Sequence, residues 1–118
     1  MIRLEDIARA AIDGEALRVR SLTQDWLAET ARISQAPPPS GDDSMVRVVA
    51  AALVELFALR RGEPPPEWAA GVGPLDTPLY LLRSAAVMPR LRRLCELESP
   101  EPLRRRRIYA PPDYLMAA

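Results

Sequence analysis

The sequence predicts an all-α fold, an irregular bundle of about five or six short helices with proline-rich connections. Apolar residues recur at helical spacing in three successive segments, and glycines stand where two of these segments end. The 13 prolines are concentrated between segments of this kind. A chain of 118 residues, 48% hydrophobic and 27% charged, has the composition of one globular domain, which we expect to span residues 1–118.

Three helices are predicted in the N-terminal half. The first begins near Leu4, and Gly14 ends it by adopting a left-handed conformation. The second covers residues 15–33, with its charged residues mostly outside the apolar stripe. The segment 44–61 has the widest apolar arc and is followed by Gly62, so we expect it to be the central, most buried helix.

Two proline runs separate these helices from one another and from the C-terminal half. Residues 35–44 (QAPPPSGDDS) cannot propagate a helix and predict a polar connector. Asp42, Asp43 or Ser44 then supplies the N-cap of the central helix. Residues 64–66, three further prolines, predict a rigid, extended exit from that helix.

The C-terminal half predicts shorter elements. Pro78 starts a short helix, another covers residues 89–97, and a third starts at 99–101. The segment 99–116, which includes the run 104–107 and Ile108 and Tyr109, is the only one whose sequence allows a strand, and 113–116 form a last turn. The inner face of the helix at 89–97 is expected to consist of Leu91, Leu94 and Cys95.

Several classes of chemistry are excluded by composition. The chain has no histidine and one cysteine, which removes imidazole catalysis and the usual zinc sites. Its five glycines match no phosphate-binding loop. We therefore expect no enzyme activity, no metal and no cofactor. Three carboxylate pairs remain, which we interpret as helix-start charges, a capping turn and a solvated face: Glu5 with Asp6, Asp42 with Asp43, and Glu96 with Glu98.

The same composition predicts a cytoplasmic protein. Cys95 has no second cysteine with which to form a disulfide, and the start MIRLEDIARA carries charges where a signal peptide needs an apolar run. The longest apolar stretch, 46–59, is interrupted by Arg47 and Glu55 and is shorter than the ~20 residues that cross a bilayer. We expect no membrane association.

All 16 basic residues are arginines, and 10 of them lie from residue 60 onward, against seven acids there. The run 104–107 has the chemistry to contact nucleic-acid phosphates. Basic runs are more often solvated or paired with nearby acids, and the formal net charge is zero. Trp68 and Tyr109 are interpreted either as interface anchors or as residues that pack in the core.

The C-terminal half, from Glu63 onward, resembles a group of short bacterial proteins with a Pro-Pro-x-Trp element and a terminal motif E-S-P-x-x-F-R-R-R-x-[IV]-F-V that is followed by Asp and Leu. The matching residues are Pro65, Pro66, Trp68, Glu98, Ser99, Pro100, Leu103, Arg104, Arg105, Arg106, Ile108, Tyr109, Asp113 and Leu115. Leu103 and Tyr109 replace phenylalanines of the motif, and Arg107 stands where glycine or asparagine is usual. The resemblance implies the small, antitoxin-like partner of a nucleotidyltransferase-like protein, and it brings no catalytic residues.

We therefore expect a non-enzymatic binding or regulatory protein that contacts another protein through its arginine-rich C-terminal segment. The candidate partner-binding residues are Trp68, Arg104, Arg105, Arg106, Arg107 and Tyr109. A nucleic-acid-binding accessory protein that uses the arginine run on phosphates is the alternative, and homo-oligomerisation stays open. A purely structural alternative is that Ile108 and Tyr109 dock the tail on the domain while the arginines stay solvated.

Overall fold

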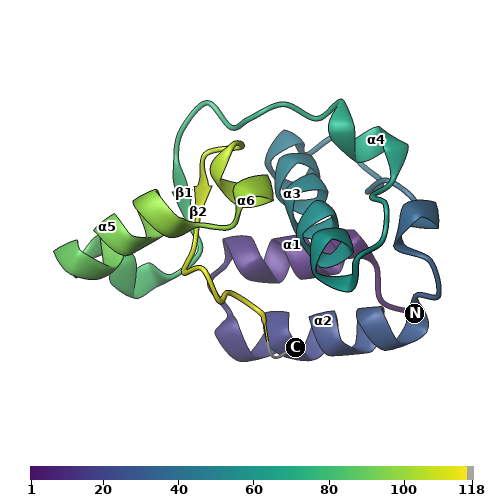
Figure 1. Ribbon diagram of the computed structural model, residues 1–118, viewed down its shortest axis with the longest axis horizontal. Coiled ribbons are helices and arrows are strands. Elements are labelled where there is room, and N and C mark those ends of the chain that lie inside the picture. Colours follow the sequence, from purple (N-terminus) through teal and green to yellow (C-terminus); the bar gives the residue numbers. More distant parts are fainter. Residues whose placement is uncertain (117–118) are drawn as a thin grey trace.

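The computed structural model describes residues 1–116 around a long central helix, α3 (Ser44–Arg61) (Figure 1). The other α-helices of this part of the chain are α1 (Leu4–Ile12), α2 (Ala16–Glu29), α4 (Glu67–Ala70), α5 (Pro89–Glu98) and α6 (Glu101–Arg104). The remaining elements are two 3-10 helices, η1 (Ile33–Gln35) and η2 (Arg83–Ala86), and two strands, β1 (Leu79–Tyr80) and β2 (Ile108–Tyr109). The predicted all-α fold class, with short helices and proline-rich joints, is confirmed.

The central helix is buried on all sides. Every residue of α3 from 48 to 58 is buried, which fits a helix rich in Ala, Val and Leu around its whole circumference. Asp43 caps the first turn by accepting a hydrogen bond from the backbone N–H of Val46 at 3.2 Å. Gly62 ends the helix in a left-handed conformation, with φ of 67°. Both ends therefore agree with the sequence prediction.

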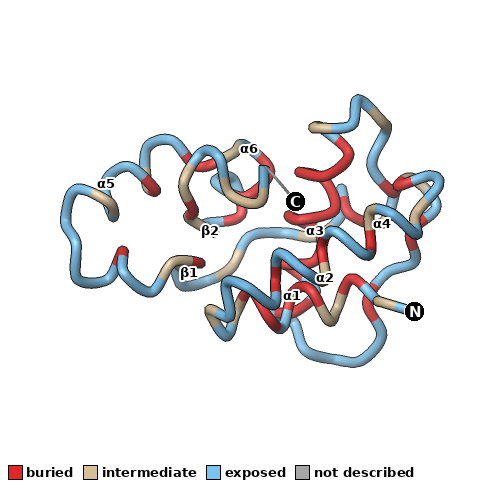
Figure 2. Tube along the Cα trace, turned by 90° about the horizontal axis from the view of Figure 1, so that it is seen from below, coloured by how far each residue is buried: buried red, intermediate tan, exposed pale blue. Residues whose placement is uncertain are grey.

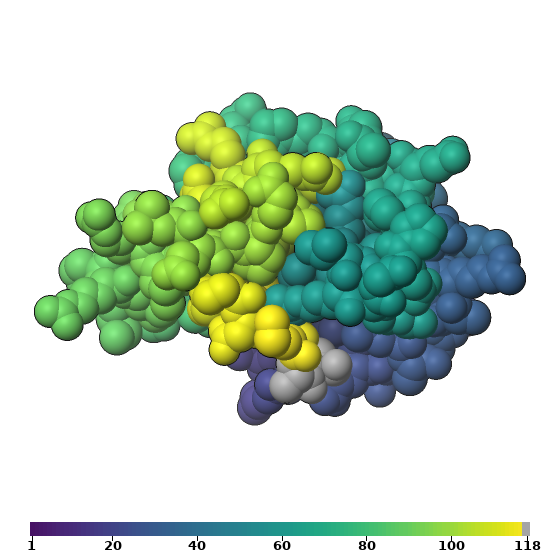
Figure 3. All heavy atoms as spheres, in the orientation of Figure 1, coloured from purple at the N-terminus to yellow at the C-terminus, as the bar shows by residue number. Residues whose placement is uncertain are grey.

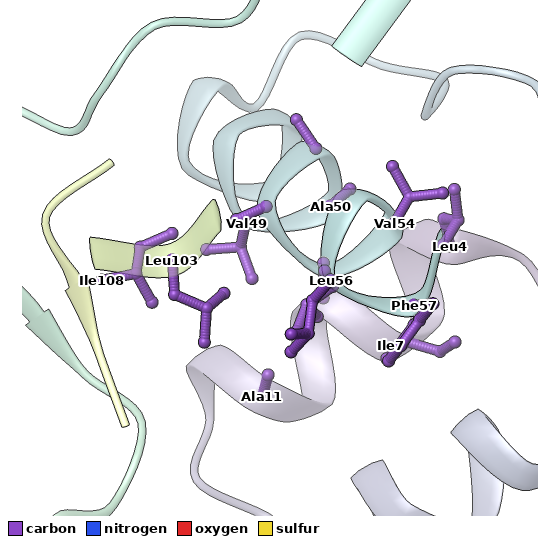
Figure 4. Packing of buried hydrophobic residues seen from close by; sticks show 14 of the residues in the cluster. Leu4, Ile7, Ala11, Val49, Ala50, Val54, Leu56, Phe57, Leu103 and Ile108 are labelled. Carbon is purple, nitrogen blue, oxygen red and sulfur yellow. The ribbon is translucent and has the colours of Figure 1, made fainter. Parts of the chain in front are cut away.

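α1 and α2 form a helical hairpin that packs against α3. The left-handed Gly14, with φ of 72°, makes the turn between them, as predicted. Figure 4 shows Leu4 and Ile7 of α1 beside the part of α3 that carries Val54 and Phe57. Alanines of α1 and α3 are completely or almost completely buried in the same cluster. Their small side chains let the backbones of these two helices approach closely.

The second helix is shorter than predicted. It ends at Glu29, and the chain continues in an extended conformation into η1. The guanidinium of Arg61 donates hydrogen bonds to the carbonyls of Leu27 and Thr30, each at 3.3 Å, so α3 provides partners for the terminal carbonyls of α2. The backbone N–H of Ile33 donates to the carboxylate of Glu63 at 3.1 Å. Tertiary contacts thus replace the helical hydrogen bonds that the sequence pattern predicted.

The helix predicted to start at Pro78 is not formed, and β1 occupies its place. β1 pairs in parallel with β2, in the register Leu79 to Ile108 and Tyr80 to Tyr109. The backbone N–H of Leu79 donates to the carbonyl of Arg107 at 3.0 Å. These pairing partners lie almost thirty residues away in sequence, so no local pattern signals them. β2 lies in the one segment where the sequence allowed a strand, but the expectation that no other segment contains one is wrong, because β1 lies outside it.

Candidate functional site

Arg106, in the middle of the arginine run, lies inside the protein with 2% of its surface exposed. It follows α6, which packs against α3. Its guanidinium donates hydrogen bonds to the carboxylate of Glu55 and to the carbonyls of Ala69 (2.8 Å), Val72 (3.2 Å) and Pro102 (3.2 Å). The expectation that Arg106 lies on a partner-binding surface is therefore corrected, because burial removes this guanidinium from any partner.

Glu55 of α3 is the anionic member of this buried cluster, with 6% of its surface exposed. Its Oε1 accepts hydrogen bonds from both Arg105 and Arg106. Burial raises the pKa of Glu55, but the hydrogen bonds and positive charges of the two guanidinium groups outweigh burial and leave this pKa below its ordinary value. The carboxylate is thus ionised at neutral pH and joins the C-terminal segment to the central helix.

The three other arginines of the run reach the surface. Arg104 donates to the carbonyl of Leu97 at 2.9 Å and pairs with Glu101 at 3.1 Å. Arg105 keeps about half of its side chain exposed. Arg107 adopts a left-handed conformation with φ of 64° and donates to the carbonyl of Asp76 at 2.8 Å. A tight turn therefore forms here with arginine at the left-handed position.

The two aromatic candidates are half-buried and engaged within the fold. The indole N–H of Trp68 donates to the carbonyl of Ala36 at 2.8 Å and so holds the proline-rich connector. The ring of Tyr109 packs against that of Tyr80, with centroids 5.4 Å apart. Four residues of the C-terminal motif are completely or almost completely buried: Ser99, Leu103, Arg106 and Ile108. These four residues therefore hold the C-terminal segment on the core.

The segment formed by η2 and α5, residues 83–98, projects from the rest of the protein, and we call it the arm (Figures 1 and 3). Most of its surface is exposed (Figure 2), and Cys95 is the one buried residue of α5. Exposed apolar side chains gather on it: Val87 (80% exposed), Met88 (52%), Leu94 (36%) and Leu97 (59%). Exposed apolar side chains on one projecting segment are a feature that interaction surfaces share.

The outward face of α5 alternates cations with leucines. Because a helix turns about 100° per residue, the side opposite Cys95 carries Arg90, Arg93, Leu94 and Leu97. Leu94 was expected on the inner face but lies at its exposed edge. Among residues 1–116, neither Arg90 nor Arg93 has an ion pair or a side-chain hydrogen bond. Residue spacing alone could have shown that these four residues share one side of the helix. It could not have shown that the fold leaves this side uncovered.

The inner side of the arm is fixed to the strands. The hydroxyl of Tyr80 donates a hydrogen bond to the carboxylate of Glu96. Arg92 lies 5.0 Å from the centroid of the Tyr80 ring and pairs with Glu96 at 3.5 Å. At the C-terminal end of the arm, the Ser99 hydroxyl donates to the carbonyl of Ala110 at 3.0 Å and accepts from its N–H at 2.9 Å. The outward face is thus presented from an anchored helix.

No family model matches the chain, and no curated protein or solved structure is detectably similar to it. Within residues 1–116, no group of three or more Cys, Asp or Glu side chains is arranged to hold a metal ion. In the same part of the chain no helix combines the length and the apolar character that a bilayer crossing requires. The physical features of the arm and of the arginine cluster therefore carry the functional argument.

Proposed function

We propose that this chain is a non-enzymatic binding protein that contacts a partner protein through the outward face of its arm. The binding face consists of Val87, Met88, Arg90, Arg93, Leu94, Leu97 and the adjacent Arg104. The observation that carries the proposal is the alternation of free arginines with exposed leucines on an anchored, projecting helix. The antitoxin-like role and the nucleotidyltransferase-like partner implied by the C-terminal motif are part of this proposal.

Charge complementarity indicates the chemistry of the partner. In the part of the chain that the structure describes, the binding face carries Arg90 and Arg93 without ion pairs and Arg104 paired with Glu101. Glu96 of the same helix is turned toward Tyr80 and Arg92, and Glu98 is exposed. A partner surface with carboxylates around an apolar centre would pair with these guanidinium groups and cover the leucines. Arginine suits this role because it combines contact area with several hydrogen-bond donors.

Binding to nucleic acid is the second candidate. Arg104, Arg105 and Arg107 reach the surface, and guanidinium groups bind phosphates well. The leucines between the arm's cations favour a protein partner instead, because phosphate contacts gain nothing from exposed aliphatic side chains. A formal net charge of zero points in the same direction.

The test must leave the fold intact. A chain shortened after Pro102 would lose Leu103 and Ile108, which are completely buried, so its failure to bind would be uninformative. A double variant, Arg90→Glu with Leu97→Glu, instead changes two exposed residues of the binding face and reverses the charge at one of them. A matched control places the same charges on α2, at the exposed Leu17 and Arg18.

We expect the wild-type chain and the control variant to co-purify the same protein from the native host. The purified pair should bind in calorimetry with an affinity that falls as salt rises. The arm variant should bind at least about tenfold more weakly. Equal binding by the arm variant, or no protein partner for the wild-type chain, would refute the proposal. Salt-sensitive, submicromolar binding of the isolated chain to nucleic acid would support the alternative.

A further inference from the structure

A second feature lies at the other end of the molecule, away from the arm. The N-terminal segment, the end of α2, η1 and the proline-rich connector come together near the N-terminus (Figure 1) and enclose a pocket of about 390 Å³. We call it the N-terminal pocket. Its volume lies within the range of cavities that bind small organic molecules, about 300–1,000 Å³. Its apolar wall is formed by Ile2, Leu4, Trp26, Ala36 and Pro37–Pro39.

The wall of the pocket is held in place at both ends of the proline run. At one end the indole N–H of Trp68 donates to the carbonyl of Ala36 at 2.8 Å. At the other, the backbone N–H and the hydroxyl of Ser40 donate to the carboxylate of Glu5 at 3.1 and 2.7 Å. Proline fixes the φ angles between these anchors. The connector therefore resists collapse into the pocket, and the binding space exists before a ligand arrives.

The floor of the pocket offers an aromatic contact. Trp26 is 5% exposed, and its ring packs against Phe57 of α3, with centroids 5.8 Å apart. This packing fixes the indole in one position, and the small part of it that stays exposed adds a preorganised apolar edge to the pocket. A fixed aromatic wall reduces the entropy that binding would otherwise cost.

The charged side chains around the pocket balance one another. Arg3 and Arg32 contribute two positive charges, Glu5 and Glu29 two negative ones, and Glu5 already accepts hydrogen bonds from Ser40. An anionic or cationic ligand would gain no net attraction from these four side chains. The side chains of Thr30 and Gln35 add uncharged hydrogen-bonding groups to the lining.

We infer that the N-terminal pocket binds a small, uncharged and mainly apolar molecule, which contacts the proline wall and the exposed edge of Trp26 and forms one or two hydrogen bonds with the polar lining. This inference is independent of the proposed protein contact, because none of its residues belongs to the arm.

The test uses N-phenyl-1-naphthylamine, an uncharged aromatic probe whose fluorescence rises in apolar surroundings. We expect saturable one-to-one binding to the full chain, with a dissociation constant on the order of 10–100 µM. Gln35→Trp, which places a large side chain in the pocket lining, should weaken binding at least about tenfold. Gln24→Trp makes the same change on an exposed part of α2 outside the pocket and should leave binding within about twofold.

Nuclear Overhauser contacts from the probe to the wild-type chain locate the site without depending on any variant. Contacts to the methyl groups of Ile2, Leu4 and Ala36 are expected. Contacts to Leu94 and Leu97 would instead place the probe on the arm and overturn the inference. Absence of saturable binding, or equal binding by the Gln35→Trp and Gln24→Trp variants, would overturn it as well.

Discussion

The guanidinium of Arg106 donates a hydrogen bond to the carboxylate of Glu55, across 51 positions of the sequence. Both side chains are buried, and the pair joins the segment after α6 to the central helix. A buried ion pair compensates the loss of hydration of its two charges only while both members are present. The arrangement therefore makes the C-terminal segment part of the fold and leads to two predictions.

Removing one member of the pair should be strongly destabilising. Arg106→Met leaves the buried Glu55 with Arg105 as its remaining cationic partner and deprives three backbone carbonyls of their donor, so we expect a loss of about 3–5 kcal/mol in the free energy of unfolding. Urea denaturation followed by circular dichroism measures this loss. Arg104→Ala, at an exposed ion pair, should change stability by less than about 1 kcal/mol. Similar losses for the two variants would contradict the structural role of Arg106.

The pair also predicts how stability depends on pH. The pKa of Glu55 is lowered from 4.5 in the folded protein, so the unfolded state takes up a proton at this group first as the pH falls. The stabilisation from ionised Glu55 is therefore fully present above about pH 5 and is lost as the pH falls through the lowered pKa. Denaturant unfolding at about pH 7 and pH 3 should show a larger loss for wild type than for Glu55→Gln. A larger loss of unfolding free energy for Glu55→Gln than for wild type would contradict the lowered pKa of Glu55 and reject the prediction.

Phe57 and Leu59 provide a comparison within α3. Phe57 is 3% exposed and packs against Trp26, whereas Leu59 is 63% exposed. We expect Phe57→Ala to cost about 3–5 kcal/mol of unfolding free energy, because it leaves a cavity beside the indole. Leu59→Ala should cost less than about 0.5 kcal/mol. Chemical denaturation of both variants checks the orientation of α3. A large loss of unfolding free energy for Leu59→Ala would contradict this orientation.

The left-handed conformation of Arg107 allows a test of the turn before β2. Glycine adopts a φ of 64° without strain, so Arg107→Gly should lie within about 1 kcal/mol of wild type despite losing the bond to Asp76. Valine is β-branched and unsuited to positive φ, so Arg107→Val should be less stable than the glycine variant by about 1–2 kcal/mol. Thermal unfolding of the two variants makes the comparison. Equal stability would argue against a left-handed residue here.

Local signals determined much of the helical architecture from sequence. The cap at Asp43, the left-handed Gly14 and Gly62, and the apolar arc of α3 each depend on residues within a few positions of one another. Such signals act over one or two helical turns. The start of α5 at Pro89 was predictable for the same reason, because proline suits the first turn of a helix.

Tertiary structure alone decided the features on which the proposals rest. β1 forms at Leu79 because Ile108 lies beside it, and α2 stops early because Arg61 provides partners for its last carbonyls. Among four consecutive arginines, the sequence could not indicate which one finds a buried carboxylate. The outward face of the arm and the N-terminal pocket depend likewise on which surfaces other elements cover. Local periodicity specifies which residues share a face, whereas exposure is set by contacts between segments far apart in the chain.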